Sequence, residues 1–410
     1  MSHILIIEPN MSGHHGPYVR WIVEAALAHD LKVTLATSSE AVSHTSMIDI
    51  KNEFGDHCEI VALPWRKLSA EGRKKKIMPP LLETQLINYR FWADAYRCVS
   101  NVDFVFVPSV DGCLYYTALR GSPFQHTRWG GIVMRPHFNF APVGMKGPTA
   151  SLSGRLKERF FIRLLAQKTL CELITIDETL PVYLSLKNRR FVNKIRYLAD
   201  PNEINTPLAK ADGRASLGLD EGKWVILLFG SLSWRKGVVD LLNATISNQW
   251  PPECQVLLMG RPDSDVQKQI LRPEVQQAIR DRRVQVIDRY VTDTKRDAAL
   301  AACDAVWCCY KQFYQMSGVL VLAGLARRPV VASCEGLIGW LTKKYNCGVV
   351  LEKSNPATVC STIHKLVADT RHSEVMGDNG ARYFAAHSIT NAKNTIGAFL
   401  EQNAKGDGQV

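Results

Sequence analysis

Residues 224–237 read WVILLFGSLSWRKG, an unbroken apolar run that ends in a turn of small and basic residues. A short apolar run bounded by a glycine is typical of a strand buried on both faces of a sheet. Gly230 allows a sharp change of backbone direction, and a helical pattern then extends from Lys236 to Thr245. A strand, a turn and a helix in this order predict one unit of a parallel sheet covered by helices.

Comparable apolar runs alternate with helical patterns along the whole chain. They lie at residues 3–7, 32–36, 60–63, 104–107, 131–134, 173–176, 195–198, 255–260, 284–287, 305–308, 329–333 and 348–351. Proline and polar residues interrupt the rhythm at 199–213, so two domains are expected, at 1–203 and 204–385. We predict an α/β protein with two Rossmann-like, doubly wound parallel-sheet domains facing a central cleft. Residues 386–410 are expected to form a C-terminal helix that packs back on the first domain, followed by a disordered tail.

The composition is that of a soluble globular protein, with 46% hydrophobic and 22% charged residues among 410. No apolar stretch is long enough to span a membrane, and the N-terminal apolar run lacks the basic region of a secretory signal. The eleven cysteines include no Cys-x-x-Cys pair, which disfavours a zinc site or a disulfide framework. A cytoplasmic location is therefore expected.

The formal net charge of +11 favours an anionic partner such as a nucleotide, a nucleic acid or a phospholipid. Basic residues gather at 66–76 and 155–168, and each cluster has a plain alternative interpretation as a solvated surface. The segment 154–165 is both basic and apolar. It is expected either to contact the inner face of an anionic membrane peripherally and offer a lipid-linked acceptor, or to be a surface helix whose arginines extend into solvent. Nucleic acid is disfavoured because neither cluster forms a known module with interleaved stacking aromatics.

The turn after the strand at 224–229 has the properties of a phosphate-binding site. The start of a helix offers unpaired N–H groups and a positive dipole end, and Arg235 and Lys236 add two positive charges there. Such an arrangement suits a diphosphate, above all one that departs and gains negative charge. The plain alternative is a surface turn with two solvated basic residues.

The pattern Phe-Gly-Ser-Leu-Ser-x-Arg-Lys-Gly at 229–237 resembles the donor-diphosphate element of GT-B glycosyltransferases of group 1, the glycogen-synthase and lipid-linked mannosyltransferase type. The segments that follow resemble the same family in the same order. These are a second strand with its glycine at 256–260, a base-binding segment at 288–291, a helix and strand at 298–310, and a donor loop with its helix at 315–323. The resemblance covers most of residues 224–351 and implies the GT-B fold.

The resemblance also implies a nucleotide-sugar site. Its residues would be Gly16, Gly230, Ser231, Arg235, Lys236, Arg289, Tyr290, Tyr310, Gln315, Ser317, Gly318 and Val319. Members of the family commonly have glutamates at the positions of Gln315 and Ala323, where the first contacts the donor sugar and the second the ribose. Gln315 retains a neutral amide that can hydrogen-bond a sugar, whereas Ala323 retains no polar group.

Further candidates follow predicted strands and would contact the acceptor or the sugar. His14 and His15 lie in a glycine-containing turn after the first strand, and Asp111 follows the strand at 104–107. In the family a histidine after the strand at 131–134 lies against the donor sugar, which makes His137 the best catalytic candidate of the first domain. Glu335 would accept hydrogen bonds from sugar hydroxyls. The plain alternatives are capped or solvated histidines, an Asp-Gly turn and a carboxylate that favours a helix dipole.

The function implied is a hexosyltransferase that uses a UDP-type or GDP-type sugar, with no metal and no cofactor, and with retention at the anomeric carbon. His137, Arg235 and Lys236 would carry the catalysis. The acceptor would be a glycan, a lipid-linked sugar or a small molecule. The alternatives are a catalytically inactive GT-B subunit that binds a ligand or a partner, which the replaced glutamates motivate, and a sugar-nucleotide epimerase.

Overall fold

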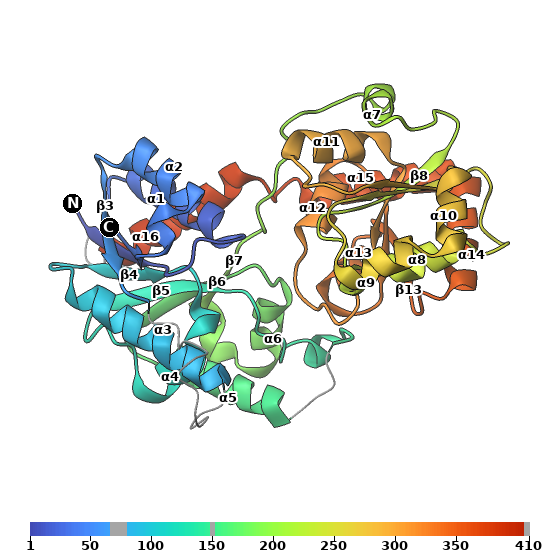
Figure 1. Ribbon diagram of the computed structural model, residues 1–410. Coiled ribbons are helices and arrows are strands. Elements are labelled where there is room, and N and C mark those ends of the chain that lie inside the picture. Colours follow the sequence, from blue (N-terminus) through green and yellow to red (C-terminus); the bar gives the residue numbers. More distant parts are fainter. Residues whose placement is uncertain (66–79, 148–151, 406–410) are drawn as a thin grey trace, which may run out of the picture. The chain divides into compact units, whose positions relative to one another are not determined.

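The computed structural model describes residues 1–65, 80–147 and 152–405, which form two compact units (Figure 1). Unit 1 comprises Met1–Val143, Thr149–Ala199 and Ile389–Val410, and unit 2 comprises Gly144–Pro148 and Asp200–Ser388. The basic cluster expected at 66–76 and the tail at 406–410 lie outside the described residues. Each unit is an α/β structure with its own parallel sheet and its own hydrophobic core, so the predicted fold class is confirmed.

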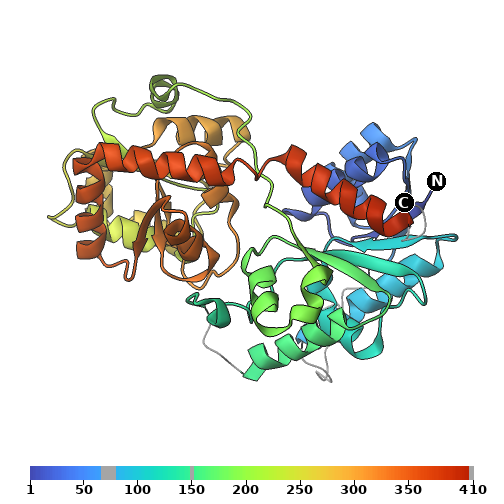
Figure 2. The same ribbon diagram turned by 180° about the vertical axis from the view of Figure 1, so that it is seen from behind.

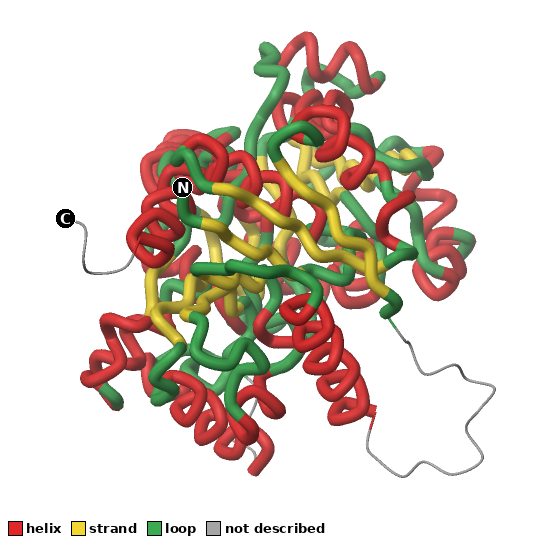
Figure 3. Tube along the Cα trace, turned by 90° about the vertical axis from the view of Figure 1, so that its left-hand side faces the viewer, coloured by secondary structure: helices red, strands yellow, loops and turns green. Residues whose placement is uncertain are grey.

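Unit 1 contains a seven-stranded sheet in the order β3-β2-β1-β4-β5-β6-β7, and every described pair is parallel. Its strands are β1 His3–Ile7, β2 Lys32–Ser38, β3 Cys58–Leu63, β4 Phe104–Val107, β5 Arg128–Val133, β6 Leu170–Thr175 and β7 Ile195–Tyr197. Figure 3 shows these strands running side by side between helices. The central strand β1 is buried along its whole length, as its unbroken apolar sequence predicts.

Helices cover both faces of this sheet. The helices are α1 His15–Ala28, α2 Thr45–Phe54, α3 Pro80–Arg97, α4 Leu114–Arg120, α5 Leu152–Leu165, α6 Thr179–Lys187 and α16 Ile389–Lys405. The side chains of β1 pack against helices on both sides. Ile4 and Ile6 pack with α1 and α16, whereas Leu5 and Ile7 pack with α3, α4 and α5. Because successive residues of a strand point to opposite faces of the sheet, the short apolar strand β1 contributes side chains to the hydrophobic layers on both faces.

The C-terminal helix α16 lies beside α1 in unit 1, although the two helices are far apart in the sequence (Figure 2). The ring of Phe399 meets Phe104 and Phe106 edge-on, with centroids 6.1 Å and 5.6 Å apart. Lys393 forms an ion pair with Glu24 of α1. The last helix therefore completes a hydrophobic layer that the first 199 residues leave open.

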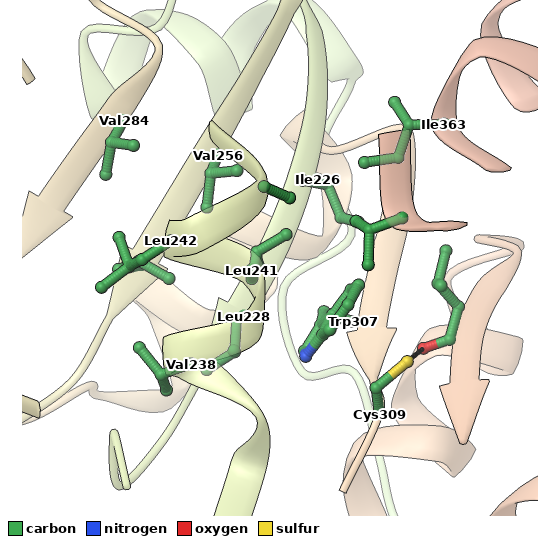
Figure 4. Packing of buried hydrophobic residues seen from close by; sticks show 14 of the residues in the cluster. Ile226, Leu228, Val238, Leu241, Leu242, Val256, Val284, Trp307, Cys309 and Ile363 are labelled. Atoms are coloured by element: carbon green, nitrogen blue, oxygen red, sulfur yellow. Dashed lines mark hydrogen bonds between the residues drawn. The ribbon is translucent and has the colours of Figure 1, made fainter. Parts of the chain in front are cut away.

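Unit 2 contains a six-stranded parallel sheet in the order β10-β9-β8-β11-β12-β13. Its strands are β8 Trp224–Phe229, β9 Cys254–Met259, β10 Val284–Ile287, β11 Ala305–Cys308, β12 Val330–Ser333 and β13 Gly348–Leu351. Its helices are α7 Lys210–Leu217, α8 Val238–Thr245, α9 Ser264–Ile270, α10 Pro273–Arg280, α11 Asp293–Ala302, α12 Gly318–Leu325, α13 Gly336–Lys344, α14 Pro356–Ala368 and α15 Thr370–Phe384. Figure 4 shows Leu228, Leu241 and Trp307 in one of its hydrophobic layers.

The helix after the basic turn begins later than the sequence pattern predicts. Arg235 and Lys236 lie in a short 3-10 turn, Trp234–Lys236, and α8 starts only at Val238. Gly237 separates the two with a φ of +71°, a left-handed conformation that a continuous helix cannot contain. The two basic side chains therefore precede the N-terminus of α8.

Candidate functional site

Two glycines at the carboxyl ends of β8 and β9 shape the turn in unit 2. Gly230 has a φ of +94°, and its N–H donates to the carbonyl of Met259 over 2.9 Å. Gly260 has a φ of +140°, and a Cβ atom there would overlap the carbonyl oxygen of Gly230. Only glycine readily adopts these positive φ values and leaves room for the close approach, so the two loops can lie against each other. Because Gly230 has no side chain, another group can approach the backbone at the end of β8 closely.

The amine of Lys236 lies close to the backbone at Gly230. Its Nζ donates to the carbonyl oxygen of Phe229 over 2.7 Å, and a Cβ atom at Gly230 would lie 2.7 Å from it. The same Nζ lies 5.6 Å from the centroid of the Tyr310 ring. Burial lowers the pKa of Lys236 to about 8, with the charge of Arg235 acting in the same direction. Among the described residues no carboxylate pairs with this amine, so its charge is available to an anion.

Arg235 is exposed beside this lysine. Its guanidinium lies 5.1 Å from the centroid of the Phe313 ring, and its carbonyl oxygen accepts from the N–H of Lys311 over 2.7 Å. A hydrogen bond connects the turn to the hydrophobic core, because the indole N–H of the buried Trp307 donates to the carbonyl of Lys236 over 3.1 Å. Backbone contacts therefore hold both basic residues, while the guanidinium is left without a carboxylate partner among the described residues.

A pocket of about 240 Å³ opens beside the turn, at the carboxyl ends of β11, β12 and β13. Trp234, Tyr310, Lys311 and Glu335 are among the residues that line it. The amine of Lys311 forms an ion pair with Asp240 of α8 over 2.7 Å. Burial raises the pKa of Tyr310, and a hydrogen bond with the Ser317 side chain partly offsets the rise. The structure thus brings Tyr310 and Glu335 together around a polar hollow with one aromatic wall.

A short strand-like contact supports Glu335. Lys146, from the segment of unit 2 that precedes residue 149, pairs with Glu335 in a β-bridge, and its carbonyl accepts from the N–H of Gly336 over 2.7 Å. The Lys146 amine forms an ion pair with Glu352, which also lines the pocket. Sequence analysis missed this contact because residues 144–148 carry no motif and lie far from Glu335 along the chain.

The donor-loop residues surround the start of α12. Ser317 is the N-cap residue, Gln315 and Val319 are half-buried, and a Cβ atom at Gly318 would lie 2.8 Å from the Asn202 side chain. Ala323 is fully buried within α12. Its methyl group therefore contributes to the core of unit 2.

Ser231, Arg289 and Tyr290 are exposed residues that follow strands of unit 2. Ser231 adjoins the glycine turn. Arg289 and Tyr290 follow β10 at the edge of the sheet, where β9 separates them from β8, and Tyr290 is 76% exposed. An aromatic ring this exposed is available for stacking on a planar ligand.

In unit 1, the turn after β1 contains a histidine–carboxylate contact that the sequence did not reveal. Nδ1 of His15 lies 3.2 Å from a carboxylate oxygen of Glu8, whose other oxygen accepts from the N–H of Asn10 over 3.1 Å. The rings of His14 and His15 stack with centroids 4.5 Å apart. Gly16 is buried in α1, where a Cβ atom would meet the Ser46 side chain. The position of Glu8 directly after a buried strand was the signal that could have identified it.

The carboxylate of Asp111 forms hydrogen bonds with the backbone that follows β5. Its two oxygens accept from the N–H groups of Met134 over 2.7 Å and Arg135 over 3.1 Å. Lys157 of α5 donates to the carbonyl oxygen of Arg135 and is largely buried, which lowers the pKa of Lys157. These contacts hold the loop that leads to His137.

Two of the three candidate histidines of unit 1, His14 and His137, have lowered pKa values. Burial, with Lys157 and Arg135 nearby, lowers the pKa of His137 to about 4. Burial, with His15 and Arg135 nearby, lowers the pKa of His14 to about 4 as well. His14 follows β1 and His137 follows β5, so both lie beyond the carboxyl ends of neighbouring parts of one parallel sheet. Arg135 and Lys157 are contributors that sequence analysis did not single out.

Within residues 1–65, 80–147 and 152–405, no group of three or more histidine, cysteine, aspartate or glutamate side chains is placed to hold a metal ion. In the same ranges, no helix combines the length and the apolar character that crossing a membrane requires.

Comparisons with known proteins identify a matching segment and a shared fold. Residues 223–369 match the family described as Glycosyl transferases group 1. Sucrose-phosphate synthase from Thermosynechococcus elongatus is similar in structure, with a TM-score of 0.68, 17% identity, and coverage of 98% of this chain and 99% of that one. HepE from Anabaena in complex with UDP gives a TM-score of 0.67, 15% identity, and coverage of 98% and 99%.

WaaG, a glycosyltransferase involved in lipopolysaccharide biosynthesis, gives a TM-score of 0.62 at 13% identity, with coverage of 97% of this chain and 99% of that one. Among curated proteins, none matches the chain significantly in sequence. At these low identities the structural likeness shows the fold. It does not by itself assign a substrate.

Proposed function

We propose that this protein transfers a hexose from a nucleoside-diphosphate sugar to an acceptor, because residues 223–369 match the group 1 glycosyl transferases and the whole chain shares the fold of sucrose-phosphate synthase. The donor would be of the UDP or GDP type, and the reaction would retain the anomeric configuration without a metal ion. The acceptor would be a glycan, a lipid-linked sugar or a small molecule. HepE in complex with UDP-glucose, and an Escherichia coli protein bound to UDP-2-fluoro glucose, support a UDP-type donor.

The observation that carries this proposal is the position of Lys236. Its amine lies on Gly230 at the end of β8, donates only to the Phe229 carbonyl among the described residues, and has no acidic partner there. Because its pKa is about 8, the amine is mostly protonated at neutral pH. A cation held in place before the reaction stabilises the negative charge that develops on a departing diphosphate.

The neighbouring residues have consistent roles in this proposal. Arg235 would neutralise the second charge of the diphosphate, and Tyr290 would stack on the base. The N-terminal N–H groups of α12, after Ser317, would hold a phosphate oxygen. The Gln315 amide would hydrogen-bond the donor sugar, in place of the carboxylate common in the family.

His137 would act on the sugar as a neutral imidazole. With a pKa of about 4, it can donate one hydrogen bond and accept another at pH 7, which suits a hydroxyl group. His14, with the same lowered pKa, has the same capacity and would contact the acceptor. Glu335 would accept from sugar hydroxyls in the pocket beside the turn.

Calorimetric titration of the full chain with UDP and with GDP tests the donor site. One nucleotide should bind, and Lys236→Ala should weaken that binding at least about tenfold, since a hydrogen bond to a charged group contributes about 1.5–3 kcal/mol. Lys268→Ala, an exposed lysine on α9, is the matched control and should bind as the wild type does. No binding of either nucleotide would refute the proposal.

Turnover is the second stage of the test. Incubation with a panel of UDP-sugars and GDP-sugars should release diphosphate, and NMR of the product should show a retained anomeric configuration. His137→Ala should lower the rate, and an unchanged rate would remove His137 from the catalytic residues. Nucleotide binding without turnover on any donor would instead indicate an inactive binding subunit.

A further inference from the structure

The solvent face of α5 in unit 1 has an unusual composition for an exposed helix surface. Phe161, Leu164 and Leu165 are fully buried against the sheet. On the opposite side the helix exposes three arginines and two leucines in consecutive turns. These are Leu152, Arg155, Leu156, Arg159 and Arg163. A surface helix normally presents polar residues there, so the leucines need an explanation.

The two leucines are not marginally exposed. Leu152 is 85% exposed and Leu156 is 52% exposed. The one acidic residue of α5, Glu158, lies at the edge of this face between Arg155 and Arg159, and it accepts a hydrogen bond from the Tyr183 hydroxyl of α6. Among the described residues, none of Arg155, Arg159 and Arg163 forms an ion pair. The face therefore combines an excess of positive charge with accessible apolar side chains.

The adjacent helix α6 and the turn after it extend the same surface (Figure 1). Leu186 is 61% exposed, and Lys187, Arg189 and Arg190 are exposed beside it. A hollow of about 430 Å³ lies between α5 and this turn. It is lined by Arg155, Glu158, Arg159, Ile162 and Asn188. The hollow is lined by two guanidinium groups, an amide and the Glu158 carboxylate, and that carboxylate already accepts from the Tyr183 hydroxyl. The two guanidinium groups and the amide suit a phosphate group, while the leucines nearby suit acyl chains.

We propose that this face, formed by α5, α6 and residues 188–190, docks the protein on an anionic phospholipid bilayer, with a lipid phosphate in the hollow between Arg155 and Arg159. Charge complementarity selects an anionic surface, and the exposed leucines select one with an apolar interior, which a soluble polyanion lacks. The inference rests on unit 1 alone and is independent of the donor chemistry proposed for unit 2.

Vesicle co-sedimentation of the full chain tests this proposal. The wild type should bind vesicles of phosphatidylglycerol mixed with phosphatidylcholine and should not bind vesicles of pure phosphatidylcholine. Replacing Arg155, Arg159 and Arg163 together by glutamine should weaken binding at least about tenfold, since each basic residue near an anionic surface contributes. The matched control is R97Q/K268Q/R371Q, which removes the same charge from exposed positions elsewhere and should bind nearly as the wild type does.

A leucine variant separates insertion from charge attraction. L152S/L156S/L186S should bind about as well as the wild type in low salt, and should lose the binding that the wild type retains at about 0.5 M salt, where screening removes most of the electrostatic part. All variants change exposed side chains, and circular dichroism would confirm that they fold.

Three outcomes would overturn the proposal. The first is failure of the wild type to bind anionic vesicles, and the second is equal binding by the arginine variant and its control. The third is binding of single-stranded DNA that depends on the same three arginines while vesicles are not bound, which would assign the face to nucleic acid. None of these outcomes bears on nucleotide binding by unit 2, so the two proposals fail separately.

Discussion

The carboxyl edges of the two sheets are built in different ways. In unit 2 the backbone decides the geometry, because glycines with positive φ bring two loops together and a lysine amine rests on one of them. In unit 1 side chains decide it, because Asp111, Glu8 and Lys157 each bind backbone or ionisable groups from other segments. A site fixed by glycines is local and is carried by a motif, whereas a site fixed by side chains depends on segments brought together by the fold.

The difference extends to charge. Unit 2 offers a protonated amine, since the pKa of Lys236 is about 8. Unit 1 offers two imidazoles whose pKa values of about 4 keep them neutral. The first suits an anion and the second suits hydroxyl groups, as a donor diphosphate and an acceptor would require.

The largest expected effect is the loss of stability when a side chain is added to Gly260 in unit 2. Gly260→Ala would place a Cβ atom on the carbonyl oxygen of Gly230 at a φ of +140°, so we expect a loss of about 4 kcal/mol or more in the free energy of unfolding. Denaturant unfolding measures it. Gly222→Ala, where the added methyl meets only ordinary contacts, is the control and should change stability by less than about 1 kcal/mol. Equal stability of the two variants would show that the turn adapts, and the comparison between the units would fail.

The second effect concerns the cost of holding a lysine in this turn. The pKa of Lys236 in the folded protein, about 8, is below its ordinary value of 10.5, so the folded state binds fewer protons than the unfolded state between these values. Stability should therefore rise with pH from about 8 to 10.5, by up to about 3 kcal/mol. Lys236→Met should lack this rise and be more stable than the wild type at pH 7, while losing nucleotide affinity. Parallel stability curves for the two proteins would contradict this account.

The third effect tests whether side chains organise the edge of unit 1. Asp111→Asn leaves only one good acceptor for the N–H groups of Met134 and Arg135, so we expect unfolding to require about 1–2 kcal/mol less. Asp49→Asn, which removes the same charge from an exposed position on α2, should be neutral. Equal denaturation midpoints for both variants would mean that the loop before His137 does not depend on Asp111.

How much the sequence could predict follows the same division. The strands of both sheets were predicted because unbroken apolar runs such as those of β1 and β8 are legible without tertiary information. The turn at Gly230 was predicted because its residues are adjacent in sequence. The start of α8 was predicted too early, since nothing local shows that Gly237 adopts a left-handed conformation. The contacts of Asp111 and Lys146 could not be predicted, because their partners lie 23 and about 190 residues away.

The smallest expected effect is the absence of a histidine titration near neutral pH. If burial and the nearby cations hold the pKa values of His14 and His137 at about 4, their imidazole resonances in an NMR titration should stay in the neutral form from pH 8 down to about 5.5. His137→Asn, an exchange that tolerates the φ of +62° at this position, should leave the shape of the pH profile of turnover unchanged in that range. A midpoint near 6.5 for either histidine would mean that unit 1 gains positive charge as the pH falls through neutrality. Both units would then present cations to an anionic ligand, and the assignment of unit 1 to hydroxyl groups would no longer follow from its electrostatics.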